Sequence, residues 1–250
     1  MRTLTQVWVF FLTLTFLFLL LGFQIAGRLG LFIAFLFSLT IVYATLHRGV
    51  RLFRKKLNAQ LFNGNDSSGF LTELNSHKLK FGLRKIYVYR TNTHTPPLVW
   101  KSRPTEGHLL INSQLVDNLN PHEIKLLSLL LLSHLEKRSF MITPILSVIN
   151  QSFFALNILS AIISKTVAFV FKIKRDILNA DAKFKKEGES SDFELGFFLN
   201  KLHNFEYHQN KKQLGTEYFS VLSLKKFNFF DQYGIPSLKQ RLEKIMGFAI

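Results

Sequence analysis

The segment Pro121–Arg138 reads P-H-E-I-K-L-L-S-L-L-L-L-S-H-L-E-K-R and is predicted to form a helix. Asn120 is a suitable N-cap residue, and Pro121 suits the first helical position. Glu123 stands at the third position, where its side chain can complete a capping box. His134 follows a run of leucines near the end of the segment, and it is the first candidate for chemistry.

His134 occupies a position that is typical of a zinc ligand in metallopeptidases. Their helix carries H-E-x-x-H, in which two histidines one turn apart bind Zn²⁺ and the glutamate activates water. Here the first histidine position is Leu130 and the glutamate position is Leu131. Two interpretations stay open. His134 is either the remnant of a lost ligand set or a core histidine that is hydrogen-bonded to the backbone.

The composition indicates one domain of moderate size together with membrane segments. The chain has 250 residues, 48% of them hydrophobic, with 27 phenylalanines and no cysteine. The lack of cysteine excludes disulfides, thiolate metal sites and a cysteine nucleophile. The net charge of +16 suits nucleic acid, an anionic membrane surface or cytoplasmic loops.

Two apolar runs near the N-terminus, Val7–Phe23 and Leu29–Leu46, predict a transmembrane hairpin. Each run has 17 or 18 residues, at the short end of the roughly 17–25 that span a bilayer core. The link Gln24–Arg28 leaves room only for a tight turn. A signal peptide is the alternative for the first run, but the second run and the lack of a small-x-small cleavage site argue against it.

The basic segment 48–56 follows the second run and contains five Lys or Arg residues and no acid. The turn of the hairpin has a single cation, Arg28. Because cytoplasmic loops carry an excess of cations, we expect both ends of the hairpin in the cytoplasm. A basic cluster beside a membrane also suits anionic lipid head groups, and no nucleic-acid-binding motif is present, so nucleic acid is not expected as a partner.

The rest of the chain mixes helices and strands. We expect a polar linker at 63–69, strands at 83–89, 98–101 and 108–112, a turn at 105–107, and helices at 70–81, 114–118, 172–186, 193–205 and after Pro236. The helix 193–205 is expected to carry one apolar stripe made of Phe193, Phe197, Phe198 and Leu202. These elements predict an α+β fold with a small sheet.

A third apolar region, 141–171, lies between two basic flanks. Its 31 residues are longer than a bilayer core needs, and Asn150 and Gln151 near its middle suggest a turn. We expect a short membrane-inserted hairpin. A segment that packs on the membrane without crossing it and a buried soluble helix pair are the alternatives.

The order of these features resembles the membrane-embedded zinc metallopeptidases of the HtpX type, which are relatives of the CAAX prenyl endopeptidases. The resemblance covers nearly the whole chain. The family helix H-E-L-S-H-x-x-x-R lies over 130–138, and the R-E-x-x-A-D segment lies over 176–181. The family tail H-P-x-x-x-x-R-I lies over 235–242.

The chain matches the family at scaffold positions and departs from it at the positions that carry the zinc chemistry. The scaffold positions agree, and they are Ser133, Arg138, Ala180, Asp181, Pro236 and Arg241. The resemblance places the first ligand, the base and the third ligand on Leu130, Leu131 and Ile177, and it places Ile235 where the family has histidine. Asp176 adjoins the lost third ligand but is turned about 100° away on a helix. His134 is then the only remaining ligand.

The resemblance implies a degenerate family member with a transmembrane hairpin at 1–56 and a mainly helical metallopeptidase-like domain at 57–250. It implies a pseudopeptidase of the bacterial inner membrane, multi-pass, with its soluble domain in the cytoplasm. Such a protein would bind membrane-protein segments or an active peptidase paralogue without cleaving, and would need no cofactor. The alternative is an active zinc endopeptidase with non-standard ligands in membrane-protein quality control. A third hypothesis is a structural membrane protein that uses its surface only for assembly.

Overall fold

A computed structural model describes residues 2–47, 58–62, 66–92, 95–141, 172–205 and 236–247. The chain divides into two compact units, Met1–Phe53 and Arg54–Ile250. Three expectations lie outside the described residues. They concern the basic segment 48–56, the apolar region 141–171 beyond its first residue, with Asn150 and Gln151, and Ile235.

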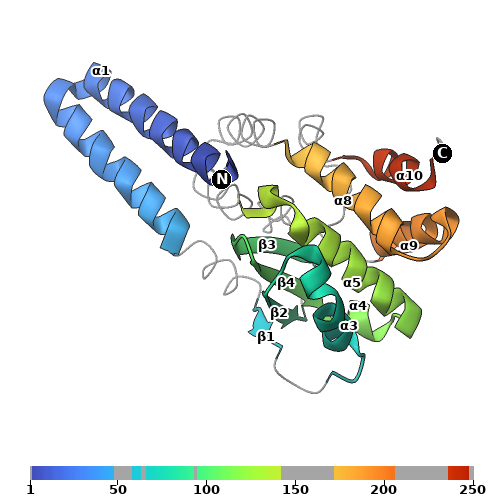
Figure 1. Cartoon of the computed structure of the whole chain (residues 1–250). Coiled ribbons are helices and arrows are strands. Elements are labelled where there is room, and N and C mark those ends of the chain that lie inside the picture. Colours follow the sequence, from blue (N-terminus) through green and yellow to red (C-terminus); the bar gives the residue numbers. More distant parts are fainter. Residues whose placement is uncertain are drawn as a thin grey trace. The chain divides into compact units, whose positions relative to one another are not determined.

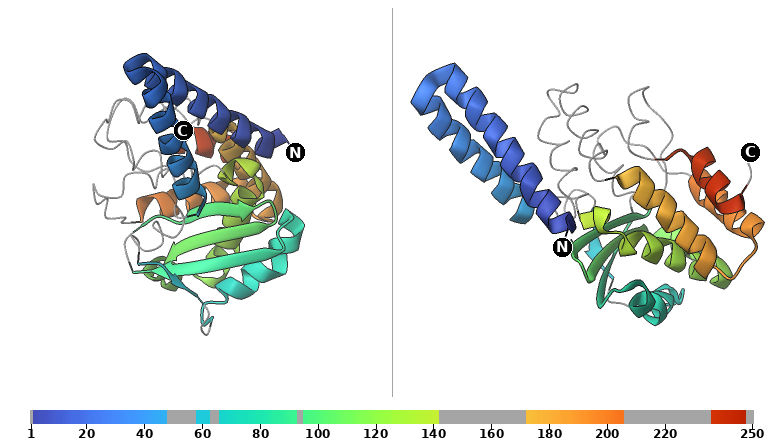
Figure 2. Two further views of the ribbon diagram at one scale, coloured as in Figure 1. Left: turned by 90° about the vertical axis from the view of Figure 1, so that its left-hand side faces the viewer. Right: turned by 45° about the horizontal axis from the view of Figure 1, so that its top comes forward.

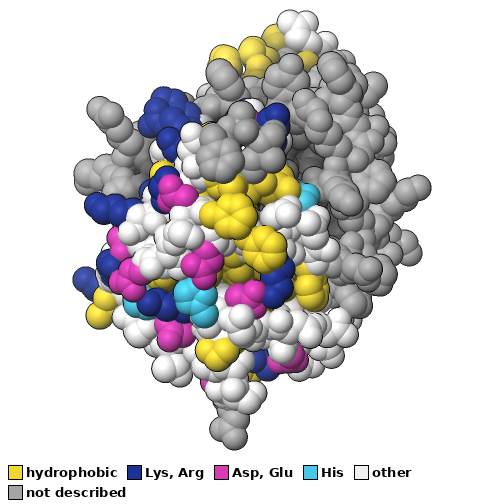
Figure 3. Space-filling model, turned by 90° about the vertical axis from the view of Figure 1, so that its right-hand side faces the viewer, with side chains coloured by type: hydrophobic (Ala, Val, Ile, Leu, Met, Phe, Trp, Pro, Cys, Tyr) yellow, Lys and Arg dark blue, Asp and Glu magenta, His cyan; other side chains and the backbone are white. Residues whose placement is uncertain are grey.

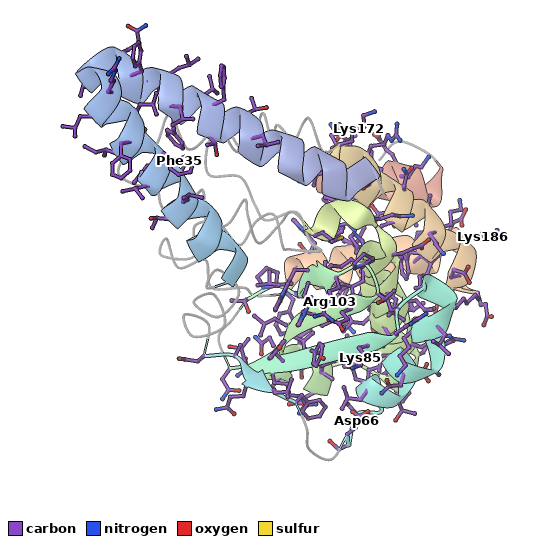
Figure 4. The ribbon with its side chains drawn as sticks, turned by 60° about the vertical axis from the view of Figure 1, so that its left-hand side comes forward. Phe35, Asp66, Lys85, Arg103, Lys172 and Lys186 are labelled. Carbon is purple, nitrogen blue, oxygen red and sulfur yellow. The ribbon has the colours of Figure 1, made fainter. Side chains whose placement is uncertain are left out.

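The first unit consists of the helix α1, Arg2–His47, which is broken once. Ala26 has φ −139° and Gly27 has φ 56°, so the helix reverses within the predicted link Gln24–Arg28. A positive φ is the conformation that glycine adopts most readily, which explains Gly27 at this point. Figure 1 shows the two arms lying side by side, and Figure 4 marks Phe35 on the second arm.

Small residues lie between the two arms. A Cβ atom added to Gly30 would lie 1.9 Å from the carbonyl oxygen of Gly22, so the backbones are in direct contact there. Phe18 and Phe37 meet across the same seam, with ring centroids 5.8 Å apart. The larger apolar side chains point outward and are exposed; they include Leu12, Phe16, Leu21, Ile25, Phe32 and Ile33. Within the described residues, the stretch Thr15–Thr40 is long and apolar enough to cross a membrane.

The second unit contains a four-stranded sheet in the order β1-β2-β4-β3. Its strands are β1 (Gln60–Leu61), β2 (Lys85–Thr91), β3 (Leu98–Arg103) and β4 (Glu106–Asn112). β2 is parallel to β4, and the other two pairs are antiparallel. The predicted strands are confirmed with shifted ends, whereas β1 was not predicted because two residues give no periodicity. The turn predicted at 105–107 lies at residues 104–105, since Gly107 belongs to β4.

Helices cover one face of this sheet in two layers. They are α3 (Phe70–His77), α4 (Ser113–Asp117), α5 (Pro121–Glu136), α8 (Ile173–Glu187), α9 (Asp192–Asn204) and α10 (Leu238–Met246), with short 3-10 turns η1 (Lys78–Phe81) and η2 (Arg138–Met141). Figure 2 shows α5 behind the sheet, with α8, α9 and α10 on the far side of α5. The fold is therefore mixed helix and strand with a small sheet, as the sequence predicts.

α5 is the central element of the second unit. Every residue from Leu126 to Leu135 is buried, because the sheet covers one side of the helix and α8 covers another. The predicted capping box is present: the Asn120 side chain accepts from the Glu123 N–H, and Glu123 accepts from the Asn120 N–H. The helix ends at Glu136, two residues earlier than predicted, because Lys137 is extended. Gly107 permits this packing, since a Cβ there would lie 2.8 Å from Leu135.

The apolar stripe predicted for α9 is wrong. Phe198 and Leu202 are buried, but Phe193 and Phe197 are 69% and 64% exposed. The reason is helical geometry, because Phe198 stands about 140° around the helix from Phe193 and cannot share its face. Figure 3 looks onto the α9 and α10 side of the unit and shows exposed hydrophobic side chains among charged ones.

Candidate functional site

His134 lies near the end of α5 with its side chain completely buried. Its Nδ1 lies 2.8 Å from the carbonyl oxygen of Leu130, one turn earlier, and the Ser133 hydroxyl donates to the same oxygen at 2.7 Å. A carbonyl oxygen only accepts, so Nδ1 carries the proton and Nε2 is the acceptor nitrogen of the ring. This confirms that His134 is hydrogen-bonded to the backbone. Phe140 packs edge-on against the imidazole, with ring centroids 5.7 Å apart.

Two other helices bring a buried ion pair to the same place. Arg241 from α10 donates from Nε to Asp181 Oδ2 at 2.8 Å and from Nη2 to Asp181 Oδ1 at 2.6 Å. Asp181 from α8 is 0% exposed and Arg241 is 1% exposed. A bidentate pair of this kind is among the strongest side-chain contacts, and its buried charges depend on each other. Arg241 therefore ties α10 to α8 in this region.

The imidazole faces this ion pair. His134 Nε2 lies 3.5 Å from Arg241 Nη2 and 3.9 Å from Asp181 Oδ1. Burial is the largest cause that lowers the pKa of His134 to about 4; Asp181 acts against this shift and the Arg241 guanidinium adds to it. The histidine is therefore neutral at pH 7. The three side chains, which we call the buried cluster, then carry no net charge.

The positions that the resemblance assigns to zinc chemistry are packed with apolar side chains. Leu130 and Leu131 are fully buried and Ile177 is 4% exposed. Within the described residues, no group of three His, Cys, Asp or Glu side chains is placed to hold a metal ion. Both ring nitrogens of His134 already face protein atoms. What the buried cluster can do is join α5, α8 and α10.

The sequence missed some parts of this site. The resemblance names Asp181 and Arg241 as scaffold positions but gives no sign that they form a bidentate pair, because the two residues are 60 positions apart. The contact of Phe140 with the imidazole had no sequence signal either. Ser133 lies on α5 as expected. The Arg138 side chain and Ile235 are outside the described residues.

A second set of contacts lies at the surface around α5 and joins it to its neighbours. Glu123 pairs with Lys201 of α9 at 2.5 Å, Lys125 pairs with Glu189 at 3.0 Å, and Glu136 pairs with Lys183 of α8 at 2.6 Å. Lys125 lowers the pKa of the exposed Glu189 carboxyl. These surface pairs join α5 to α8, to α9 and to the turn between them, whereas the buried cluster joins α5 to α8 and α10.

No family model matches this chain, and no curated protein or solved structure matches it. The resemblance to HtpX-type peptidases therefore stays a prediction that rests on the residues and their order.

Proposed function

We propose that this chain is a membrane-anchored pseudopeptidase of the HtpX type, which binds membrane-protein segments or an active peptidase without cleaving. The observation that carries the proposal is the buried cluster. The resemblance aligns three separate segments with one family, and His134, Asp181 and Arg241 from those segments meet. These residues are 47 to 107 positions apart in the chain, and their contact supports the assignment of the three segments to one region.

The buried apolar residues beside His134 support the non-catalytic half of the proposal. Catalytic zinc needs about three protein ligands and a base that activates water. Leu130, Leu131 and Ile177 offer neither. A closely packed apolar site also excludes the water that hydrolysis consumes, and it avoids the cost of unpaired polar groups.

The exposed side chains of the first unit support the membrane anchor. Leu12, Phe16, Ile25 and Phe32 are each more than half exposed, which suits lipid and not water. In the proposal the two arms cross the bacterial inner membrane as a hairpin, and the second unit lies in the cytoplasm. The basic segment 48–56 would then contact anionic head groups.

Restoring the missing ligands tests the proposal directly. The triple variant Leu130→His, Leu131→Glu and Ile177→Glu is purified in detergent beside the wild-type chain, and zinc is measured by elemental analysis. We expect less than about 0.1 zinc per chain in the wild type and about one in the triple variant. Adding His134→Ala to the triple variant should abolish zinc binding, because it removes one of three ligands.

Two results would overturn the proposal. The first is zinc-dependent cleavage of an unfolded membrane protein by the wild-type chain, which would favour the active enzyme with unusual ligands. The second is a folded triple variant, checked by circular dichroism, that binds no zinc. That result would mean that the three positions do not surround a former metal site.

Crosslinking separates a binding protein from one used only for assembly. A photoreactive residue is placed at Lys137, where α5 ends, and in a second variant at Leu17 of the hairpin. A binding function predicts a crosslinked membrane protein from Lys137. Crosslinks from Leu17 alone would favour the structural role.

A further inference from the structure

Arg90, on β2, has a hydrogen-bonding edge that no described residue fills. Its Nε and Nη2 atoms are buried and have no hydrogen-bond partner. Arg241 uses the same two nitrogens to hold both oxygens of Asp181. Among the described residues, one buried guanidinium edge is thus paired with a carboxylate and another has no hydrogen-bond partner. We propose that the empty edge of Arg90 binds a phosphate group.

Leaving this edge empty is costly. Buried N–H donors without a partner lose their hydrogen bonds to water and gain nothing in return. Folded proteins rarely keep such groups, and a bound ion or ligand is a common explanation where they do.

The position of the Arg90 guanidinium is fixed by its neighbours. The Phe62 ring lies against it, with 3.6 Å between Arg90 Cζ and the ring centroid. Phe62 is held in turn by its backbone N–H, which donates to the carbonyl oxygen of Val88 at 2.8 Å. One face of the guanidinium is thus covered by an aromatic ring. Its free edge is pre-organised, which lowers the entropy cost of binding a ligand.

The place in the sheet also suits a ligand. Arg90 is the second-to-last residue of β2, and it lies beside Ile111 of the parallel strand β4. Ligands of sheets with parallel strands usually bind beyond the carboxyl ends of those strands. On its other side Arg90 pairs with Gln60 of the two-residue strand β1. β1 is only two residues long, so it covers only a short part of this edge of the sheet.

Charge favours a phosphate as the ligand. The planar edge of an arginine fits two oxygens of a carboxylate or of a phosphate. No described acidic residue forms an ion pair with Arg90, and β2 contains Lys85 and no acid. The whole chain carries a net charge of +16. A positive chain attracts phosphate more strongly than a carboxylate, because phosphate has the higher negative charge. The phosphate is either free or part of a lipid head group. This inference does not depend on the proposed function, because it uses neither the buried cluster nor a metal.

Titration with inorganic phosphate tests the site in the full chain in detergent. Thermal unfolding is followed at increasing phosphate, with chloride at matched ionic strength as reference. Arg90→Lys keeps the charge and the stem on Phe62 but loses the two-pronged edge. We expect it to weaken phosphate binding about tenfold. Arg103→Lys is the matched control, because that side chain is 75% exposed at the end of β3 (Figure 4) and should change the affinity less than about twofold.

Equal stabilisation of the wild type and Arg90→Lys by phosphate would be a general salt effect and would overturn the proposal. A second measurement needs no variant. Phosphate should slow hydrogen exchange of the wild-type backbone at 60–62 and 88–91, and unchanged exchange there would also overturn it. Nanodiscs identify the source. A tenfold loss of phosphate affinity in phosphatidylglycerol relative to phosphatidylcholine nanodiscs points to a lipid head group, and equal affinity points to free phosphate.

Discussion

The two units of this chain differ in where they place their large apolar side chains: the first unit exposes them and the second unit buries most of them. The hairpin exposes large residues such as Phe16 and Phe32 and keeps Gly22 and Gly30 between its arms. The second unit buries the leucines of α5 and encloses a charged pair beside them. This is the difference expected between a unit in lipid and a unit in water. In lipid, helices associate through small residues in close contact, whereas in water a core excludes solvent and any charge inside it must be paired.

The largest effect should come from breaking the buried pair. Arg241→Met leaves the Asp181 carboxylate buried and unpaired, and we expect a loss of about 3–5 kcal/mol in the free energy of unfolding of the second unit. Urea titration followed by the fluorescence of buried Trp100, in a Trp8→Phe background, measures this loss. The double variant Arg241→Met with Asp181→Leu should recover most of it. If the double variant is as unstable as the single one, the energy does not come from the unpaired charge.

Acid should act on the same cluster. The pKa of His134 is about 4 in the folded chain, below the usual 6.5, so the unfolded state binds this proton more tightly. The stability from a neutral His134 is therefore complete above pH 6.5 and is lost as pH falls toward 4, by up to about 3 kcal/mol. Urea titrations between pH 7 and 4 check this, with His134→Leu as control. An unchanged pH slope in that variant would assign the acid sensitivity to other groups.

The comparison of the two units also shows what the sequence could predict. Local signals were sufficient for the start of α5, because Asn120, Pro121 and Glu123 act within one turn. They were sufficient for the helical break at Gly27, where only two residues decide the conformation. They failed where packing decides. Helical periodicity separates Phe193 and Phe197 from Phe198 and Leu202, but only packing decides which of the two pairs is buried.

The candidate site likewise has a part that the sequence predicts and a part that depends on packing. The chain order brought His134, Asp181 and Arg241 into one hypothesis, and they are in contact. Nothing local could predict that Arg241 would use two nitrogens for Asp181, or that Arg90 would have the same two nitrogens empty. Both depend on the tertiary packing of segments far apart in the chain. Strand periodicity treats Arg90 as an ordinary alternating residue.

A smaller effect is expected in the hairpin. Gly30→Leu places a large side chain against the backbone of Gly22, so the arms must separate. Overpacking of this kind costs about 1–3 kcal/mol. The chain has no cysteine, so cysteines placed at Phe18 and Phe37 report the distance between the arms. Disulfide formation should be rapid in the parent and slow with Gly30→Leu. Thr40→Leu, at an exposed position of the second arm, is the control and should leave the rate unchanged.

The smallest effect should come from the surface pairs, and it completes the contrast with the buried pair. Lys125→Ala removes the contact with Glu189, which is 74% exposed and remains solvated afterwards. We expect a loss in the free energy of unfolding that is far smaller than that of Arg241→Met, and smaller still at high salt, because exposed charges are screened. Urea titration at 0.05 M and 1 M NaCl measures both values. If the loss were as large as that of Arg241→Met, solvent exposure would not explain the difference in stability contribution between the surface pairs and the buried pair.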